Sequence, residues 1–156
     1  MRLKIKTEGT YKKSKQAREE LKQYGKEAKV ILQWLAKQFD FKLPRGLIVK
    51  PLYSQNGIHG SYGRAVYRSG RDEGHISFNV PKLRTLKKRI VFHVIFHETI
   101  HVAEGIKHGR AGHGKNFDRM MEAIVHYKPR YYEIALNETD QCKWSYELLK
   151  VAQGEA

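Results

Sequence analysis

Residues 83–105 read LRTLKKRIVFHVIFHETIHVAEG, and they are the most informative part of the chain. From Leu86 onward its apolar residues recur every three or four positions, and no proline or glycine interrupts it before Gly105. This spacing predicts a buried helix, for which Pro81 is a start signal and Gly105 a stop signal.

The second half of this helix carries the pattern HExxH at residues 97–101. Four helical residues span about 400° and about 6 Å of rise, so His97 and His101 stand on one face and can share one metal ion. Glu98 lies beside them, where its carboxylate can act as a general base toward water. These three polar groups are costly to bury on an apolar helix without partners, and a metal ion supplies one. The pattern therefore predicts a zinc hydrolase.

A catalytic zinc site needs a third protein ligand, and the spacing leaves four candidates open. In the metzincin pattern HExxHxxGxxH the third histidine would stand one position before His108, and the same shift weakens a comparison with three-histidine metal-dependent endoribonucleases. Glu122 follows His101 by 21 positions, a spacing that suits a thermolysin-like arrangement. The other candidates are Glu104 and His113.

Segments on both sides of the HExxH carry a family resemblance. Downstream the chain reads His113-Gly114-Lys115-Asn116-Phe117 and then Met120-Met121, and upstream it reads GRA at 63–65 and ISFNVPKL at 76–83. Together with the HExxH, these segments resemble the SprT-like, or Spartan-type, zinc metalloproteases over roughly residues 45–125. The pairing of HExxH with HGxxF is much more specific than either motif alone.

This resemblance implies His97, His101 and His113 as zinc ligands and Glu98 as the catalytic acid and base. It implies an α+β fold with a zincin-like catalytic core, in which a small antiparallel or mixed sheet packs on the HExxH helix. It also implies DNA-dependent cleavage of proteins attached to DNA, a DNA-repair activity. Many family members have a cysteine-rich zinc ribbon, but Cys142 is the single cysteine here, so no four-cysteine site can form within the chain.

The length of 156 residues suits a single domain. We expect a basic N-terminal helical extension over 1–43, a catalytic core over 44–127 and a C-terminal segment without a zinc ribbon over 128–156. The chain has no run of 18 apolar residues, and its N-terminus alternates charged and apolar residues where a signal peptide would need an apolar core. We expect an intracellular monomer, cytoplasmic or DNA-associated, that is neither secreted nor bound to a membrane.

The remaining segments predict further helices and strands. Residues 12–39 carry apolar residues every three or four positions among lysines and arginines, which predicts one basic amphipathic helix, or two with Gly25 as the weak point. A further helix is expected from about residue 115 to about residue 126, and a final one after it. Short strands are expected at 47–49, 63–68 and 75–79. One of the last two is expected to lend its edge to an extended substrate peptide.

Three residues near the predicted site have two readings each. Met120 or Met121 lies under the zinc or is an ordinary core residue. His93 stands four positions before His97 and therefore on the same helical face. Its side chain either contacts the metal-binding histidines without binding the metal itself or is an ordinary core histidine.

The net charge of +14 is concentrated in the first two thirds of the chain. Residues 1–50 hold 14 lysines and arginines against 5 acidic residues, residues 51–100 hold 8 against 3, and residues 101–156 hold 8 of each. This excess is typical of a solvated basic face or of a surface that binds a polyanion with strong salt dependence. The family resemblance favours DNA as that polyanion.

Tyrosines alternate with arginines around residues 53–71, a pattern that suits either the binding of single-stranded or otherwise exposed bases or an ordinary strand with one aromatic face. The tyrosines are Tyr53, Tyr62 and Tyr67. The candidate nucleic-acid contacts are Arg64, Arg68, Arg71, Lys12, Lys13, Lys15, Arg18 and Lys22.

Taken together, the residues and the resemblance predict a zinc-dependent endopeptidase that acts on DNA-bound or DNA-crosslinked proteins. Two alternatives stay open. A nucleic-acid-binding module would hold a structural zinc closed by a fourth protein ligand, and a metal-dependent nuclease would use the same histidines on another substrate.

Overall fold

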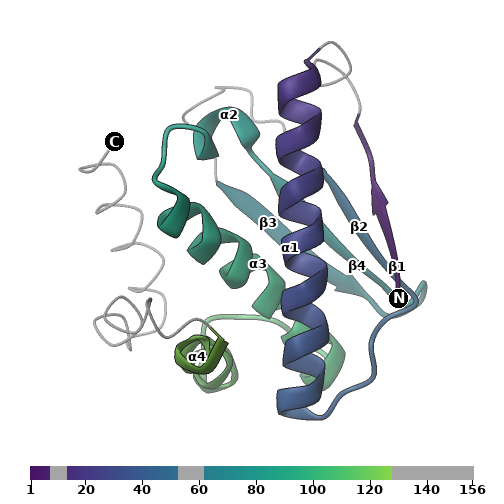
Figure 1. Cartoon of the computed structure of the whole chain (residues 1–156). Helices are drawn as coiled ribbons and strands as arrows, with labels where there is room; N and C mark the ends of the chain where they lie inside the picture. The colour runs from purple at the N-terminus through teal and green to yellow at the C-terminus, as the bar shows by residue number, and fades with distance from the viewer. Residues whose placement is uncertain (8–13, 53–61, 128–156) are drawn as a thin grey trace.

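The computed structural model of the chain describes residues 1–7, 14–52 and 62–127. Lys12, Lys13, Tyr53, Cys142 and the expected C-terminal helix lie outside these ranges. The described residues form an α+β structure with one small mixed sheet, as predicted (Figure 1). None of the helices in the described part of the chain is long and apolar enough to cross a membrane.

The sheet has four strands in the order β1-β2-β4-β3. β1 pairs parallel with β2 and β2 with β4, whereas β3 pairs antiparallel with β4, so β3 lies at an edge. The three expected strands are confirmed to within two residues, but β1 was not predicted, although its alternating residues have the period of a strand. The bounds are β1 Arg2–Ile5, β2 Gly46–Pro51, β3 Gly63–Arg68 and β4 Glu73–Phe78.

The two faces of the sheet differ because alternate side chains of each strand point to opposite sides. Ile5, Val49 and Ile76 are neighbours across three strands on the face that two long helices cover. Figure 1 shows these helices, α1 (Lys15–Phe39) and α3 (Lys88–His108), on the same side of the sheet. The hydrophobic core lies between the helices and this face.

α1 is one continuous helix. Ser14 caps its start by accepting a hydrogen bond from the amide of Ala17 at 3.2 Å, and Asp40 ends it in the left-handed conformation with φ of 52°. Of the two stated alternatives, the single helix is confirmed, and Gly25 does not interrupt it. Gly25 is buried where α1 meets β1, and a Cβ atom there would lie 2.5 Å from Cδ1 of Ile5, so this glycine permits a close approach.

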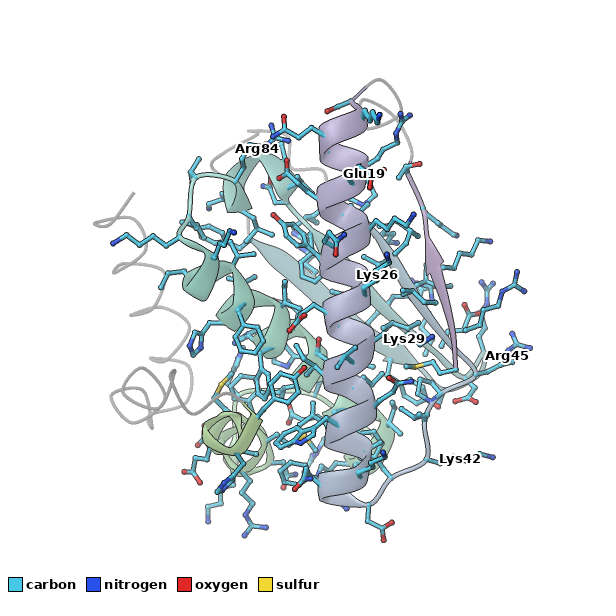
Figure 2. All side chains as sticks on the ribbon, in the orientation of Figure 1. Glu19, Lys26, Lys29, Lys42, Arg45 and Arg84 are labelled. Atoms are coloured by element: carbon cyan, nitrogen blue, oxygen red, sulfur yellow. The ribbon has the colours of Figure 1, made fainter. Side chains whose placement is uncertain are left out.

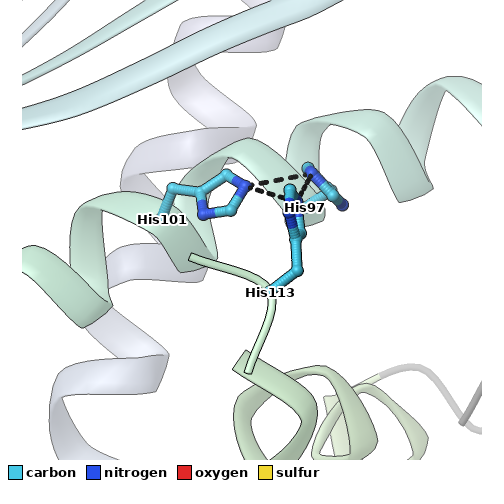
Figure 3. Close-up of side chains that lie close together, drawn as sticks. All are labelled: His97, His101 and His113. Atoms are coloured by element: carbon cyan, nitrogen blue, oxygen red, sulfur yellow. Dashed lines mark hydrogen bonds between the residues drawn. The ribbon is translucent and has the colours of Figure 1, made fainter. Parts of the chain in front are cut away.

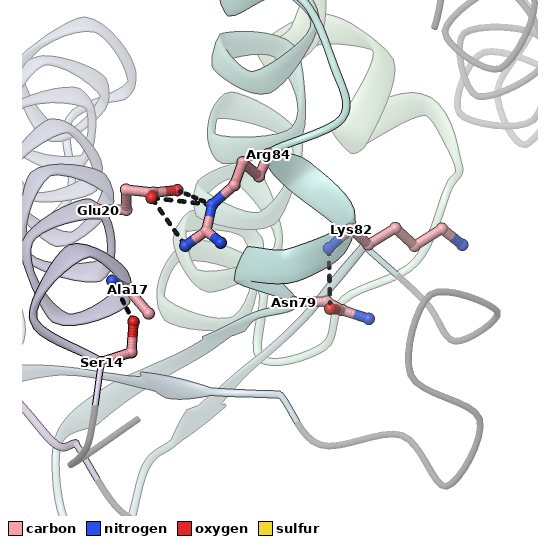
Figure 4. A network of polar contacts seen from close by, with 6 residues as sticks. All are labelled: Ser14, Ala17, Glu20, Asn79, Lys82 and Arg84. Atoms are coloured by element: carbon pink, nitrogen blue, oxygen red, sulfur yellow. Dashed lines mark hydrogen bonds and ion pairs between the residues drawn. The ribbon is translucent and has the colours of Figure 1, made fainter. Parts of the chain in front are cut away.

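The helix expected after Pro81 is divided into two. Pro81 lies in the first turn of a short helix, α2 (Val80–Leu83), and the side chain of Asn79 caps it by accepting from the amide of Lys82 at 3.3 Å (Figure 4). The hydroxyl of Thr85 then donates to the carbonyl of Lys82 at 2.7 Å. This local bond competes with continuation of the helix, and α3 begins only at Lys88.

An ion pair joins α1 to the segment that follows α2. The guanidinium of Arg84 lies 2.9 Å from Oε1 of Glu20, and its Nε atom donates to the same carboxylate at 3.0 Å (Figure 4). Both side chains are partly exposed, so the pair contributes at most about 1 kcal/mol. It serves mainly to fix the position of the short helix.

α3 runs through Gly105 instead of ending there. It continues to His108 and ends at Gly109, whose φ of 76° is the left-handed conformation typical of a residue just past a helix. The absence of a side chain at Gly105 has a tertiary reason. A Cβ atom there would lie 2.7 Å from Cβ of Tyr67 on β3, so the glycine lets the helix approach the sheet.

Gly105→Ala is expected to lower the free energy of unfolding by about 1–3 kcal/mol, the usual cost of overpacking. Helix propensity alone would favour alanine by about 1 kcal/mol, but Cβ of Tyr67 is held by the strand backbone and cannot move aside cheaply. Urea unfolding of both proteins measures the difference. The matched control is Gly112→Ala, where the added methyl group meets nothing within 4 Å. A Gly105→Ala protein more stable than the parent would contradict this account.

Two short helices follow the 109–114 loop. α4 (Lys115–Glu122) begins where a helix was expected, but the chain turns at Ala123 and α5 (Ile124–Tyr127) follows, so the single expected helix is corrected to two. The amide of Ala123 bonds to the carbonyl of Met121, a tighter turn than the α-helix makes. The inner face of α4 is apolar, with Phe117, Met120 and Met121 buried.

Candidate metal centre

Three histidine rings converge at one point between α3 and the loop that precedes α4. The Nε2 atom of His101 lies 3.1 Å from that of His97 and 3.1 Å from that of His113, and the third pair of Nε2 atoms is 3.3 Å apart (Figure 3). His97 and His101 come from adjacent turns of α3, as their spacing predicted. His113 reaches the same point because the loop folds back along the helix.

The arrangement fits a tetrahedral metal ion. Zinc–nitrogen bonds of 2.0–2.1 Å at tetrahedral angles place ligand nitrogens about 3.3 Å apart, close to the observed separations. Without a metal the contacts are poorly satisfied, because a neutral imidazole carries a single N–H and cannot donate to two neighbouring nitrogens at once. The His97, His101 and His113 cluster could therefore hold a metal ion.

The surroundings of the cluster favour neutral rings. Burial lowers the pKa of His97 well below its ordinary value, and His101 and His113 lower it further. Burial is also the largest cause that lowers the pKa of His113. Neutral imidazoles keep the lone pair that metal binding requires.

Phe117 forms the floor of the cluster. Its ring centroid lies 4.9 Å from that of His97 and 5.0 Å from those of His101 and His113. The HGxxF spacing has a physical reason here, since α4 starts two residues after His113 and turns Phe117 back beneath all three rings. The ring contacts with the histidines come from Phe117, while Met120 and Met121 are buried members of the core.

Glu98 lies beside the start of the edge strand β3. A Cβ atom at Gly63 would lie 2.9 Å from Cγ and 3.2 Å from Cδ of Glu98, so a larger residue would displace the carboxylate. Burial raises the pKa of Glu98 to about 7, against a smaller opposing effect of His101. Near neutral pH this group can both take up and release a proton. The role of Gly63 as the neighbour of Glu98 was missed from the sequence.

The other candidate ligands lie outside the cluster. His108 is exposed at the end of α3, and Glu122 is exposed at the end of α4. His93 is fully buried on α3 with its ring edge-on to Phe92, and it too lies apart from the three converging nitrogens.

Glu104 lies beside the cluster but behind one of its rings. It is buried, with Oε1 3.3 Å from Nδ1 of His101, the nitrogen that faces away from the cluster. The two groups are not aligned for a full hydrogen bond, yet neither atom has another hydrogen-bond partner in the described structure. A carboxylate behind a ligating histidine holds the proton on the outer nitrogen and leaves the inner one free for a metal.

Glu104→Ala is therefore expected to weaken zinc binding by about 10- to 100-fold, the usual cost of losing an outer carboxylate. Competition with a chromogenic chelator measures the affinity, and nitrogen NMR of the His101 ring reports which of its nitrogens carries the proton. Glu122→Ala removes an exposed carboxylate and is the matched control. Unchanged affinity together with an unchanged tautomer would show that Glu104 does not orient His101.

The proposed nucleic-acid contacts that the structure describes lie on two sides of the sheet. Arg64 and Arg68 are exposed on the sheet face away from the helices, whereas Lys15 and Lys22 are exposed on α1, which lies on the other side of the sheet. Figure 2 shows the basic side of α1 continuing through Lys26 and Lys29.

The remaining arginines and tyrosines of that prediction also separate. Arg71 is exposed in the turn between β3 and β4, and Arg18 is partly buried on α1. Tyr62 is buried, with the ammonium group of Lys82 4.1 Å above its ring, so it offers no exposed ring for stacking on a base. Tyr67 faces α3, and its hydroxyl donates to Asp72 at 2.7 Å.

Comparison with known proteins adds one finding. Residues 15–138, most of the chain, match the model of the SprT-like family. No curated protein and no solved structure matches the chain.

Proposed function

Because the chain belongs to the SprT-like family, we propose that it is a zinc-dependent endopeptidase that acts on DNA-bound or DNA-crosslinked proteins. The observation that carries the proposal is the convergence of three histidine Nε2 atoms beside a buried glutamate at a sheet edge. A metalloprotease-type function agrees with both the family and this cluster. We propose in addition that the metal is zinc, that the reaction is endopeptidase cleavage and that the substrates are associated with DNA.

His97, His101 and His113 would hold the zinc, and each has its Nε2 atom directed at the common point. When bound, zinc lowers the pKa of water toward neutrality and polarises a carbonyl group. Among the described residues, the cluster gathers no fourth histidine, cysteine or carboxylate. This supports a catalytic site with a free position over a closed structural site.

Glu98 is the proposed general base and acid. Its carboxylate takes the proton of the attacking water and then returns a proton to the leaving amine. The raised pKa of about 7 suits both transfers at neutral pH. Glu98 is 8% exposed on α3 beside the start of β3, so most of its side chain is shielded from bulk solvent.

We propose that the substrate peptide binds along the free edge of β3. β3 is bonded to β4 on one side and is the last strand of the described sheet on the other, and α3 approaches its helix-facing side at Gly63 and Tyr67. This arrangement supports the zincin-like core that we propose. Main-chain hydrogen bonds to this edge would hold an extended peptide with little regard to its sequence. This would bring a peptide carbonyl past Glu98 and the histidines.

A parallel cleavage assay tests the proposal. Metal-stripped protein is incubated with labelled casein, a histone, and labelled DNA and RNA, with and without added zinc. We expect zinc-dependent cleavage of protein and no cleavage of nucleic acid. Cleavage of nucleic acid alone would identify a nuclease, and tight zinc binding without any cleavage would identify a structural zinc module.

The DNA-associated part of the proposal is tested with the same substrates. We expect DNA to accelerate cleavage of the histone, which binds DNA, more than cleavage of casein. Equal cleavage of the histone with and without DNA would leave the endopeptidase and remove the DNA role.

A further inference from the structure

The face of the sheet opposite the helices is lined by basic residues. The pairing register puts Lys4 of β1, Ile48 of β2 and His75 of β4 next to Val66 of β3 in one row across this face. The rows on either side of it bring cations from three strands and from the residue after β1. We call this surface the basic sheet face, and its cations are Arg2, Lys4, Lys6, Lys50, Arg64 and Arg68.

The outer strands of this face are exposed and its middle is buried. Arg2, Lys4, Arg64 and Arg68 are exposed, and Val66 on β3 is 45% exposed, whereas Ile48, His75 and Ser77 on the two central strands are each 8% exposed. The helices of the described structure lie on the other side (Figure 1). Within the described residues, long cationic side chains flank the middle of the face.

The cations act on a common region. Burial lowers the pKa of His75, and the charges of Arg68, Lys50 and Lys6 lower it further, while Glu73 opposes them. These cations therefore lie close enough to the His75 ring to act on it together.

The positive charge of the face is little compensated. Glu73 is the one acidic residue among its strand positions, and its carboxylate lies near Arg45 at 4.0 Å and near His75 at 3.8 Å. Within the described residues no ion pair joins any of the six cations to a carboxylate.

We propose that the basic sheet face binds the phosphate backbone of duplex DNA. Charge complementarity indicates a polyanion, because six cations gather on one face with a single acidic residue. The cations of the two outer strands are separated by three strand spacings, about 14 Å, comparable with the roughly 12 Å width of the major groove of B-DNA. Phosphates on both sides of that groove can therefore be contacted together.

The residue types favour a duplex over a single strand. Binding of single strands relies on exposed aromatic rings on which bases stack. The strand positions of this face include no tyrosine, phenylalanine or tryptophan, and Tyr67 points to the other side, toward Gly105. The inference differs from the expectation of exposed bases. It rests on the proposed function only for its biological use.

Strand β3 borders both the basic sheet face and the candidate active site. Gly63 of β3 contacts Glu98 on the helix side, and the next residue, Arg64, points to the basic sheet face. A protein attached to the bound DNA would extend around the edge of β3 toward the histidine cluster. DNA binding would thus raise the local concentration of that substrate beside Glu98.

Fluorescence anisotropy of the 156-residue chain carrying Glu98→Gln tests the proposal without interference from proteolysis. The probes are a labelled 20-base-pair duplex and a single strand of the same length, titrated between 50 and 200 mM salt. The test variant adds Arg64→Glu and Arg68→Glu. The control adds Lys22→Glu and Lys26→Glu, which makes the same charge change at exposed positions of α1.

We expect the sheet-face variant to bind duplex at least about 10-fold more weakly at 100 mM salt, with a salt slope reduced by about two, since each lost phosphate contact removes about 0.9 from the slope. We expect the α1 variant to lose less than about threefold. Equal or greater loss in the α1 variant, an undiminished salt slope, tighter binding of the single strand, or no binding by the parent would each overturn the proposal.

Folding is controlled separately. Zinc content and melting temperature are measured for each variant, and a milder pair, Arg64→Gln with Arg68→Gln, must weaken binding in the same direction. The result is independent of the proposed enzyme. If the parent protein binds duplex through this face but cleaves no protein, the endopeptidase proposal alone is refuted. If it cleaves protein but does not bind DNA, the proposed DNA-binding surface alone is refuted.

Discussion

Glu98→Gln is expected to lower the rate of peptide cleavage by about 10²- to 10⁴-fold, the range that a general acid–base residue contributes, while zinc stays bound. The amide has nearly the shape of the carboxylate but cannot take up or return a proton. The site around Glu98 is tight, with Gly63 in contact with its side chain. An isosteric change therefore separates loss of proton transfer from loss of structure.

Three measurements check this expectation. The kcat on a labelled casein peptide should fall, zinc content should stay at the parental level, and the melting temperature should be unchanged or raised, because a neutral amide is easier to bury than a carboxylate. Glu122→Gln makes the same chemical change at an exposed position of α4 and should cleave at the parental rate. Parental cleavage by Glu98→Gln would remove Glu98 from the mechanism.

The second large effect is expected from His113→Ala, which should lose zinc and activity together. The other two ligands stand on α3, so two imidazoles would remain where a catalytic zinc needs three protein ligands. The loss of zinc affinity should exceed the 10- to 100-fold that is typical when a residue that orients a metal ligand is replaced. Activity at limiting zinc should fall by at least the same factor.

A thermal test of the same variant needs no substrate. A ligand that binds the folded state stabilises it by about 2.7 kcal/mol when present at 100 times its dissociation constant. Zinc should thus raise the melting temperature of the parent, but not that of His113→Ala. His108→Ala removes an exposed histidine nearby and should keep the zinc-induced rise. A rise lost in His108→Ala and kept in His113→Ala would reverse the choice of third ligand.

Much of the fold could be predicted because its signals are local. The apolar spacing of residues 83–105 predicted a buried helix, and the strand at 63–68 was placed to the residue. The errors fall where tertiary contacts decide. Gly105 was predicted to end its helix, and Gly25 was the weak point in the alternative with two helices, yet each lies inside a helix at a point where a strand packs closely against it.

The missed elements have the same explanation. β1 has four residues, and its alternation of charged and apolar side chains becomes a strand through pairing with β2, which lies more than forty positions later. Glu104 was weighed as a ligand, but its carboxylate faces the outer nitrogen of His101. The spacing of three positions along the helix does not determine whether a carboxylate faces the metal-binding nitrogen of a histidine or the opposite nitrogen.

The sequence pattern alone predicted that His97 and His101 share one helical face, with the candidate glutamate Glu98 beside them, whereas the α+β class was implied by the family resemblance. The shared face depends on the 3.6-residue period of the helix, which is set by backbone geometry within a few residues. Only the tertiary structure brought His113 to the other two rings, placed Phe117 beneath them and separated the basic residues onto two sides of a sheet. Those outcomes depend on how a loop folds back and how distant strands pair, and contacts between distant segments leave no fixed spacing in the sequence.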